Sequence, residues 1–196
     1  SPKPEPRTMP FADVPVGSYY YDAVLWAVEN GITKGTSDTT FSPNMTCTRA
    51  QIVAFLWRSE KSPAAGTANP FADVKSAAYY ADAVLWAVKE NITKGTTNTT
   101  FSPDADCTRA QIVTFLWRSA GAPTVSGNVG FVDVAPGSYC YEAVKWAVAN
   151  GITKGTDATH FSPNATCTRG QVVTFMYRAA GEPTVGGSNS FVDVAG

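Results

Sequence analysis

The sequence predicts an all-α protein of three tandem helix-loop-helix repeats closed into a three-fold arrangement. The motif Phe-x-Asp-Val begins at residues 11, 71, 131 and 191, which is a constant step of 60 residues. Such a period is typical of repeat architectures, in which each unit buries its apolar face against its neighbours. The predicted organisation is a Pro-rich linker cut from a longer protein (1–10), three repeats (11–70, 71–130 and 131–190) and a closing segment of a fourth motif (191–196).

Each repeat contains two helix patterns separated by a loop. In the first copy, residues 20–30 carry apolar side chains at helical spacing, and Gly31 follows as a stop signal. Residues 32–44 have turn chemistry, and residues 48–59 form the second helix. Both helices are apolar around much of their circumference, so the copies must cover one another. An open solenoid would also do this, but neither end has a polar capping repeat. We therefore expect closure, with segment 191–196 packed against the third repeat.

The second helix begins each time with Thr-Arg-Ala-Gln or Thr-Arg-Gly-Gln. Thr48 is a preferred N-cap residue, and Gln51 three positions later completes a capping box. Capping does not explain Arg49, because a cation at the first helical position opposes the helix dipole at a cost of roughly 0.3–1 kcal/mol. The same choice at Arg109 and Arg169 indicates a further role.

Composition excludes several classes of partner. The net charge is -1 and no Lys/Arg run occurs, so the protein has no general attraction for nucleic acid or anionic lipid. No apolar run approaches the roughly 18 residues of a membrane span. Any anion binding must therefore be local.

The cysteines indicate packing rather than a disulfide framework. Cys47, Cys107 and Cys167 occupy one repeat-equivalent position, as small buried side chains would. Cys140–Cys167 is the one pair worth checking for a bridge. We predict no metal site and no cofactor, since Cys-x-x-Cys spacing is absent and the only histidine, His160, is unrepeated.

The sequence predicts no catalytic residue, and so no enzyme. The other copies have Thr40 and Thr100 in place of His160, and no Gly-rich phosphate loop or nucleophile elbow occurs. Asp13 and Asp22 could serve as the paired carboxylates of a glycosidase. An Asp beside a turn is more often a local cap, which is the interpretation we adopt.

An anion-binding site is the more specific prediction. Arg49 begins a helix whose free backbone N–H groups favour an anion, and Lys34 follows the preceding helix. If these ends meet, each copy offers Arg, Lys and backbone donors to a carboxylate or phosphate. Trp26 could add a flat face for a sugar ring. The competing interpretation is that Arg49 pairs with Asp13 or Asp22 and that Trp26 belongs to the core.

These motifs resemble the S-layer homology (SLH) domain, here as a tandem of three. The resemblance rests on Phe-x-Asp-Val, the Ala-Val-Leu-Trp-Ala helix, Gly-Ile-Thr-Lys-Gly-Thr, Thr-x-Phe-Ser-Pro-Asn and Thr-Arg-Ala-Gln, and it covers the sequence from Phe11 onward. It implies an all-helical pseudo-trimer with a central three-helix bundle, located extracellularly at a Gram-positive cell wall or S-layer. It also implies non-covalent anchoring, with a pyruvylated secondary cell wall polymer, or peptidoglycan in some members, held by the motif's Arg in grooves between repeats.

The sequence departs from the family pattern in four ways. Gln51 and its equivalents replace the usual Glu, Gly170 replaces Ala, Tyr177 replaces Trp, and Lys145 replaces Leu. Losing a negative charge beside the Arg leaves it freer for an anionic ligand. The three grooves are expected to differ.

The leading hypothesis is a cell-wall anchoring module, monomeric as a fragment, that binds an anionic glycan. The rival is an interaction scaffold or adhesin module on the same fold, which presents loops to a partner protein. The predicted ligand-binding residues are arginines that take the anion, lysines that support it and tryptophans that stack on or wall the groove, namely Arg49, Arg109, Arg169, Lys34, Lys94, Lys154, Trp26, Trp86 and Trp146.

Overall fold

The computed structural model describes residues 8–186, and this range includes six α-helices and isolated β-bridges only. None of these helices is long and apolar enough to cross a membrane. The all-α prediction is confirmed, and the first two helices lie within one residue of the predicted bounds. The helices are α1 (Tyr21–Glu29), α2 (Arg49–Ser59), α3 (Ala81–Lys89), α4 (Arg109–Ser119), α5 (Tyr141–Ala149) and α6 (Arg169–Ala179).

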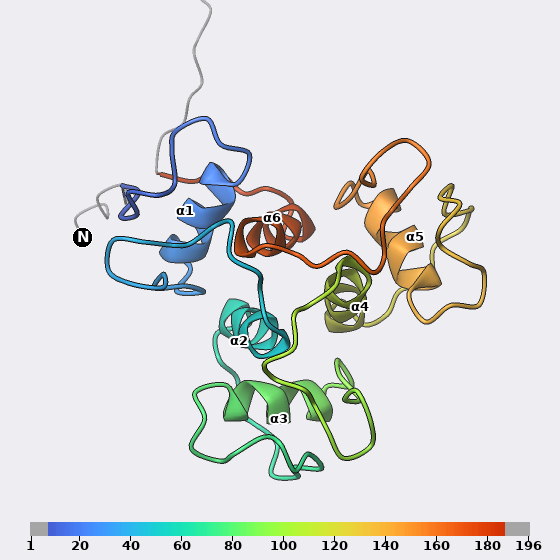
Figure 1. Cartoon of the computed structure of the whole chain (residues 1–196), viewed down its shortest axis with the longest axis horizontal. Coiled ribbons are helices and arrows are strands. Elements are labelled where there is room, and N and C mark those ends of the chain that lie inside the picture. The colour runs from blue at the N-terminus through green and yellow to red at the C-terminus, as the bar shows by residue number, and fades with distance from the viewer. Residues whose placement is uncertain (1–7, 187–196) are drawn as a thin grey trace, which may run out of the picture.

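The second helix of each repeat lies at the centre of the molecule. Helices α2, α4 and α6 form this central bundle, and α1, α3 and α5 lie outside it (Figure 1). Each outer helix packs on the central helix of the preceding repeat, α3 on α2 and α5 on α4, while α1 packs on α6. The α1–α6 contact joins the first repeat to the third, so the molecule is closed rather than an open solenoid.

A ring of backbone hydrogen bonds also closes the centre. The N–H of Cys47 donates to the C=O of Cys167 at 2.9 Å, that of Cys107 to Cys47 at 2.8 Å, and that of Cys167 to Cys107 at 2.9 Å. These three side chains are fully buried. Cys140 is buried too, and all four are free thiols, so no Cys140–Cys167 bridge forms. The shared position of three cysteines therefore reflects closure around one axis.

The predicted capping box is confirmed at all three central helices. Thr48 Oγ1 accepts from the N–H of Gln51 at 3.2 Å, and Gln51 Oε1 accepts from the N–H of Thr48 at 3.1 Å. The same reciprocal pair begins α4 and α6. The stop predicted for α1 is also present, since Gly31 follows the helix with φ +67°, a left-handed conformation that suits glycine.

Each described Phe-x-Asp-Val motif holds the loop of its own repeat. The carboxylate of Asp13 accepts from the N–H groups of Phe41 and Ser42, each at 2.8 Å. The equivalent aspartates make the same two bonds in the other repeats. The expected packing of segment 191–196, and most of the linker 1–10, lie outside the described residues.

Candidate functional site

Three grooves of similar composition surround the central bundle, and each takes side chains from all three repeats. The first, which we name the Arg169 groove, has a volume of about 420 Å³. Arg169 reaches it from the third repeat, Lys34, Gln51 and Arg58 from the first, and Tyr79 from the second. The groove therefore depends on closure of the ring.

The other two grooves repeat this composition. In each, the Arg of one repeat meets the Lys of the next, so the prediction that Arg49 and Lys34 of one copy share a site is wrong. The Arg49 groove has a volume of about 390 Å³ and the Arg109 groove about 300 Å³. They are lined respectively by Arg49, Lys94, Gln111, Arg118 and Tyr139, and by Arg109, Lys154, Gln171, Arg178 and Tyr19.

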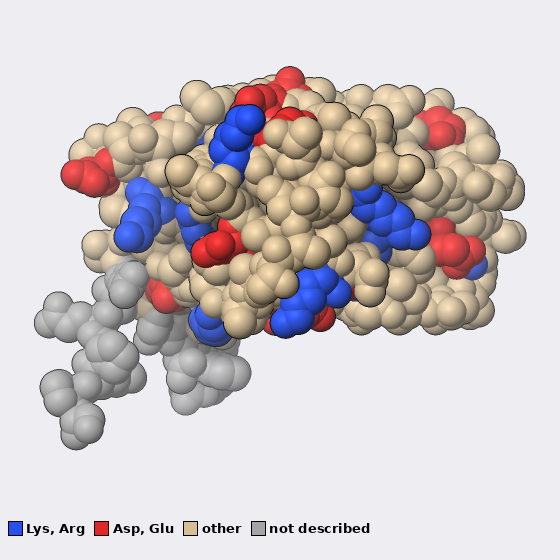
Figure 2. Space-filling view, turned by 90° about the horizontal axis from the view of Figure 1, so that it is seen from below, with Lys and Arg blue, Asp and Glu red and all other residues tan. Residues whose placement is uncertain are grey.

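Each groove contains three cations and no carboxylate among its lining residues. Three grooves of three cations account for nine of the 15 Lys and Arg residues, in a protein of net charge -1. Figure 2 shows charged side chains of both signs as separate patches on one face, with no broad basic surface. The grooves therefore concentrate positive charge, which favours a locally bound anion.

The groove arginine also ties neighbouring repeats together. Arg169 is 4% exposed, and its Nε donates to the C=O of Phe41 at 2.9 Å. Its guanidinium carbon lies 4.7 Å from the Phe41 ring centre and 5.3 Å from that of Phe55. The equivalent arginines make the same three contacts with the next repeat. These contacts explain a cation at the helix start.

The terminal nitrogens of the arginine remain for a ligand. No buried side-chain nitrogen or oxygen in 8–186 lacks a hydrogen-bond partner. The Nη atoms of Arg49 and Arg169 bond no residue in that range, so they must reach solvent in their grooves. In the third groove, Arg109 Nη2 lies 3.5 Å from Thr153 Oγ1. Burial lowers the pKa of all three arginines. They stay charged at neutral pH because the ordinary pKa of arginine exceeds about 12.

Acidic side chains attract these arginines only from beyond ion-pair distance, Asp13 acting on Arg169, Asp73 on Arg49 and Asp133 on Arg109. Among residues 8–186, no ion pair includes Arg49, Arg109 or Arg169. Asp13 uses its carboxylate on the loop of its own repeat. The competing interpretation, in which Arg49 pairs with Asp13 or Asp22, is therefore wrong.

The backbone donors at the helix starts are not available to a ligand. The N–H of Arg169 donates to the C=O of Met45 at 2.8 Å, and that of Gly170 to Pro43 at 2.9 Å. The N–H of Gln171 is occupied by the cap. Helices α2 and α4 make the same bonds to the loop of the next repeat. The prediction of free N-terminal donors is wrong, because these groups join the repeats.

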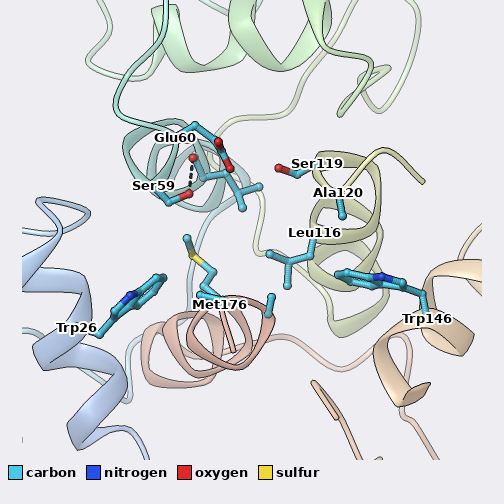
Figure 3. A pocket seen from close by; sticks show the side chains of 11 residues that line it. Trp26, Ser59, Glu60, Leu116, Ser119, Ala120, Trp146 and Met176 are labelled. Carbon is cyan, nitrogen blue, oxygen red and sulfur yellow. Dashed lines mark hydrogen bonds between the residues drawn. The ribbon is translucent and has the colours of Figure 1, made fainter. Parts of the chain in front are cut away.

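The tryptophans lie apart from the three grooves. Trp26 and Trp146 are each 8% exposed and Trp86 is 4% exposed. Trp26 and Trp146 line a separate cavity of about 230 Å³ at the C-terminal ends of the central helices, on either side of Leu116 and Met176 (Figure 3). The structure therefore places them in the core and does not bring them to the arginines.

Two further groove residues were not predicted from the sequence. The Nη1 of Arg58 donates to the C=O of Ile32 at 3.1 Å, which holds its guanidinium at the groove. Tyr79 is 61% exposed, and partial burial raises its pKa, so its side chain is a neutral aromatic group at neutral pH. Both positions keep the 60-residue step and could have been found from it, as Arg58, Arg118 and Arg178 and as Tyr19, Tyr79 and Tyr139.

The range that the structure describes has no group of three or more His, Cys, Asp or Glu residues that could hold a metal ion. The single histidine, His160, lies on an exposed loop outside the three grooves, with Nδ1 at 3.1 Å from Asp157 Oδ1.

Comparison with known families decides what this arrangement is. The model of the S-layer homology domain matches residues 10–53, 70–113 and 130–173. The chain belongs to the S-layer homology domain family. An SLH module of this kind serves at the extracellular cell surface, where it anchors a surface protein.

Relatives of this SLH module include surface proteins and an enzyme. It is 32% identical over 160 residues to the surface-layer 125 kDa protein of Lysinibacillus sphaericus, covering 79% of this module and 13% of that protein. It is 33% identical over 118 residues to a cell surface protein of Thermoanaerobacter kivui, covering 58% and 16%. It is 28% identical over 185 residues to an endoglucanase of Bacillus sp. strain KSM-635, covering 89% and 19%. The module thus spans less than a fifth of each of these three relatives.

Proposed function

We propose that this SLH module anchors its parent protein by binding an anionic, pyruvylated secondary cell wall polymer in the three inter-repeat grooves. The observation that carries the proposal is the lining of each groove by three cations and no carboxylate. A pyruvyl carboxylate has two acceptor oxygens, which suit the paired terminal nitrogens of an arginine. The proposed role is binding alone, without catalysis.

The residues of one groove have separable roles in this proposal. Arg169 takes the carboxylate through its accessible Nη atoms, since its Nε is already bonded to Phe41. Lys34 is exposed at the groove and adds a positive charge, while Arg58 adds one whose guanidinium is held by its bond to Ile32. The exposed ring of Tyr79 offers the flat face for a sugar that was expected of tryptophan.

Three grooves on one module suit a repetitive polymer. When one groove is occupied, the neighbouring sugars of the same polymer are held near the other two, which raises their effective concentration. Avidity can then exceed the affinity of a single groove by about 10²-fold or more. Firm attachment therefore does not require a tight individual site.

Sedimentation with cell walls tests the proposal. The protein is incubated with purified Gram-positive sacculi carrying a pyruvylated polymer, and with the same sacculi stripped of polymer by hydrofluoric acid. We expect co-sedimentation with the first and not with the second. Binding that survives stripping would indicate peptidoglycan as the ligand, and binding to neither would favour the protein-interaction scaffold.

Charge-matched variants show whether the grooves are responsible. Lys34→Ala, Lys94→Ala and Lys154→Ala together remove one exposed cation from each groove. The control removes three exposed lysines that line none of the three grooves, Lys61, Lys75 and Lys89, and so changes the net charge equally. We expect at least a tenfold loss of polymer binding in the first variant only, about 0.5 kcal/mol for each lysine. Equal losses would indicate unspecific charge attraction.

A further inference from the structure

The capping box fixes the direction of a side-chain amide at each groove. Gln51 Oε1 accepts from the N–H of Thr48 at 3.1 Å. A backbone N–H can only donate, so the group that faces Thr48 must be the oxygen and the other arm of the amide must be the NH₂ group. Equivalent bonds of 3.1 Å and 3.0 Å orient Gln111 and Gln171.

The NH₂ group of each glutamine is free to meet a ligand. Gln51 lines the Arg169 groove, Gln111 the Arg49 groove and Gln171 the Arg109 groove. None of the three Nε2 atoms bonds another residue within 8–186, yet no buried side-chain nitrogen there lacks a partner. The Nε2 atoms must therefore reach solvent, and all three glutamines are half-buried at their grooves.

We propose that Gln51, Gln111 and Gln171 are ligand-binding residues whose NH₂ groups donate to the same anion that the groove arginine holds. The inference rests on the proposed function and extends it to a fourth donor side chain. It also predicts that the grooves select ligands by charge. An acceptor-rich anion is matched by the NH₂ donor and three cations, whereas a ligand that offers mainly donors leaves all four unpaired.

The glutamine at the third helical position thereby has two roles, capping the helix and donating to the ligand. A Gln→Glu substitution keeps the first role and removes the second. Glu serves a capping box as well as Gln does, because either offers an oxygen to the N-cap N–H. In Gln51→Glu the second arm becomes a negatively charged acceptor in place of a neutral donor. It would repel an anionic ligand and neutralise one of the cations Lys34, Arg58 or Arg169.

The test is the triple variant Gln51→Glu, Gln111→Glu, Gln171→Glu, measured by titration calorimetry with the pyruvylated polymer fragment released by hydrofluoric acid. We expect at least a tenfold weaker affinity, with a melting temperature equal to that of the wild type because the caps persist. The Lys61, Lys75 and Lys89 triple Ala variant changes net charge by the same amount and should bind like the wild type. Three single Gln→Glu variants should each show a smaller loss.

The outcomes separate this inference from the proposed function. If the wild type binds and the groove-lysine variant binds at least tenfold more weakly, but the folded Gln→Glu triple variant binds like the wild type, the glutamine inference alone is wrong. If the wild type does not bind the fragment, both proposals are overturned. If the melting temperature of the triple variant falls, affinity is compared instead in a single Gln→Glu variant that melts at the wild-type temperature. An affinity equal to that of the wild type in this single variant would also overturn the inference.

Discussion

Asp13 and Arg169 hold the same residue, Phe41, from distant parts of the sequence. Asp13 Oδ1 accepts from the N–H of Phe41 at 2.8 Å, and Arg169 Nε donates to its C=O at 2.9 Å. The aspartate belongs to the same repeat as Phe41 and the arginine to the repeat packed against it. The loop is thus fixed within its repeat and tied across the repeat boundary at one residue, and this is the loop beside which the groove opens.

Arg169→Ala should destabilise the fold as well as weaken ligand binding. It removes a charged hydrogen bond to a backbone carbonyl and two guanidinium–ring contacts, with an expected loss of about 2–4 kcal/mol in the free energy of unfolding. Urea denaturation measures this loss. Lys34→Ala, in the same groove but exposed, should change it by less than about 0.5 kcal/mol. Similar values for the two variants would mean that the Arg169 tie contributes little.

Asp73→Ala should lower stability most strongly at neutral pH. The carboxylate accepts two backbone bonds of 2.8 Å from Phe101 and Ser102, and Ser102 holds a left-handed φ of +57°. Leaving these donors unpaired is expected to cost about 1–3 kcal/mol. Urea denaturation at pH 7 provides the comparison. A variant as stable as the wild type would contradict the role assigned to this motif.

The same aspartate should make stability depend on pH. Burial alone would raise its pKa, but the bonds from Phe101 and Ser102 prevail and lower it. A lowered folded-state pKa gives stability that is present above the unfolded value of about 3.9 and is lost as pH falls through the folded value. Wild-type stability should therefore fall below about pH 4, and Asp73→Ala should show a smaller fall. Parallel pH profiles for the two proteins would contradict this.

The Arg109 groove should bind most weakly. Arg178, one of its cations, lies 3.9 Å from the carboxylate of Glu182, where the other repeats have Ser62 and Ala122. This groove also has the smallest volume of the three. The test uses a double variant, Lys34→Ala with Lys94→Ala, in which the other two grooves are weakened. Adding Glu182→Ala to this double variant should raise polymer affinity about two- to fivefold, as expected for an exposed ion pair of up to about 1 kcal/mol. Unchanged affinity would mean that Glu182 does not attenuate Arg178.

The four cysteine thiols should be unreactive in the folded protein. Burial raises the pKa of Cys47 and of Cys167 to about 12, so the reactive thiolate is scarce at pH 8. Cys107 and Cys140 are also buried, at 0% and 3% exposure, so a reagent cannot reach them in the folded protein. Titration with a disulfide reagent should detect almost no thiol in buffer and all four in urea. Rapid labelling without urea would show that the centre opens readily.

Local chemistry made most of the fold predictable. The helix bounds, the Thr48–Gln51 cap and the Gly31 stop depend on residues within one turn of each other, and all are present. Closure was predictable because both helices are apolar on too many sides for one repeat to cover. The hydrogen-bonded ring at Cys47 was not, since nothing local distinguishes a buried cysteine on an axis from one elsewhere.

The sequence predicted which arginines and lysines would line the grooves, but not which repeats would supply the residues of one groove. A repeat shows which positions are equivalent, yet it does not show which copy supplies the neighbour. Arg49 was expected beside Lys34 and lies instead in a groove with Lys94 and Tyr139. Trp26 was ambiguous for a related reason, because an aromatic residue at helical spacing suits both a core and a groove wall.

The contact between α1 and α6 determines how the module would carry a mechanical load. The described range begins beside α1, and near its other end the N–H of Gly186 donates to Glu29 Oε1 of α1 at 2.8 Å. A load applied at either end of the described range therefore acts first on the outer helix α1 and the central helix α6. The Arg169 groove takes Arg169 from α6 and Lys34 from the loop after α1, so under the proposed function an opening of this pair would separate two of its cations, while the α2–α3 and α4–α5 pairs would keep their packing.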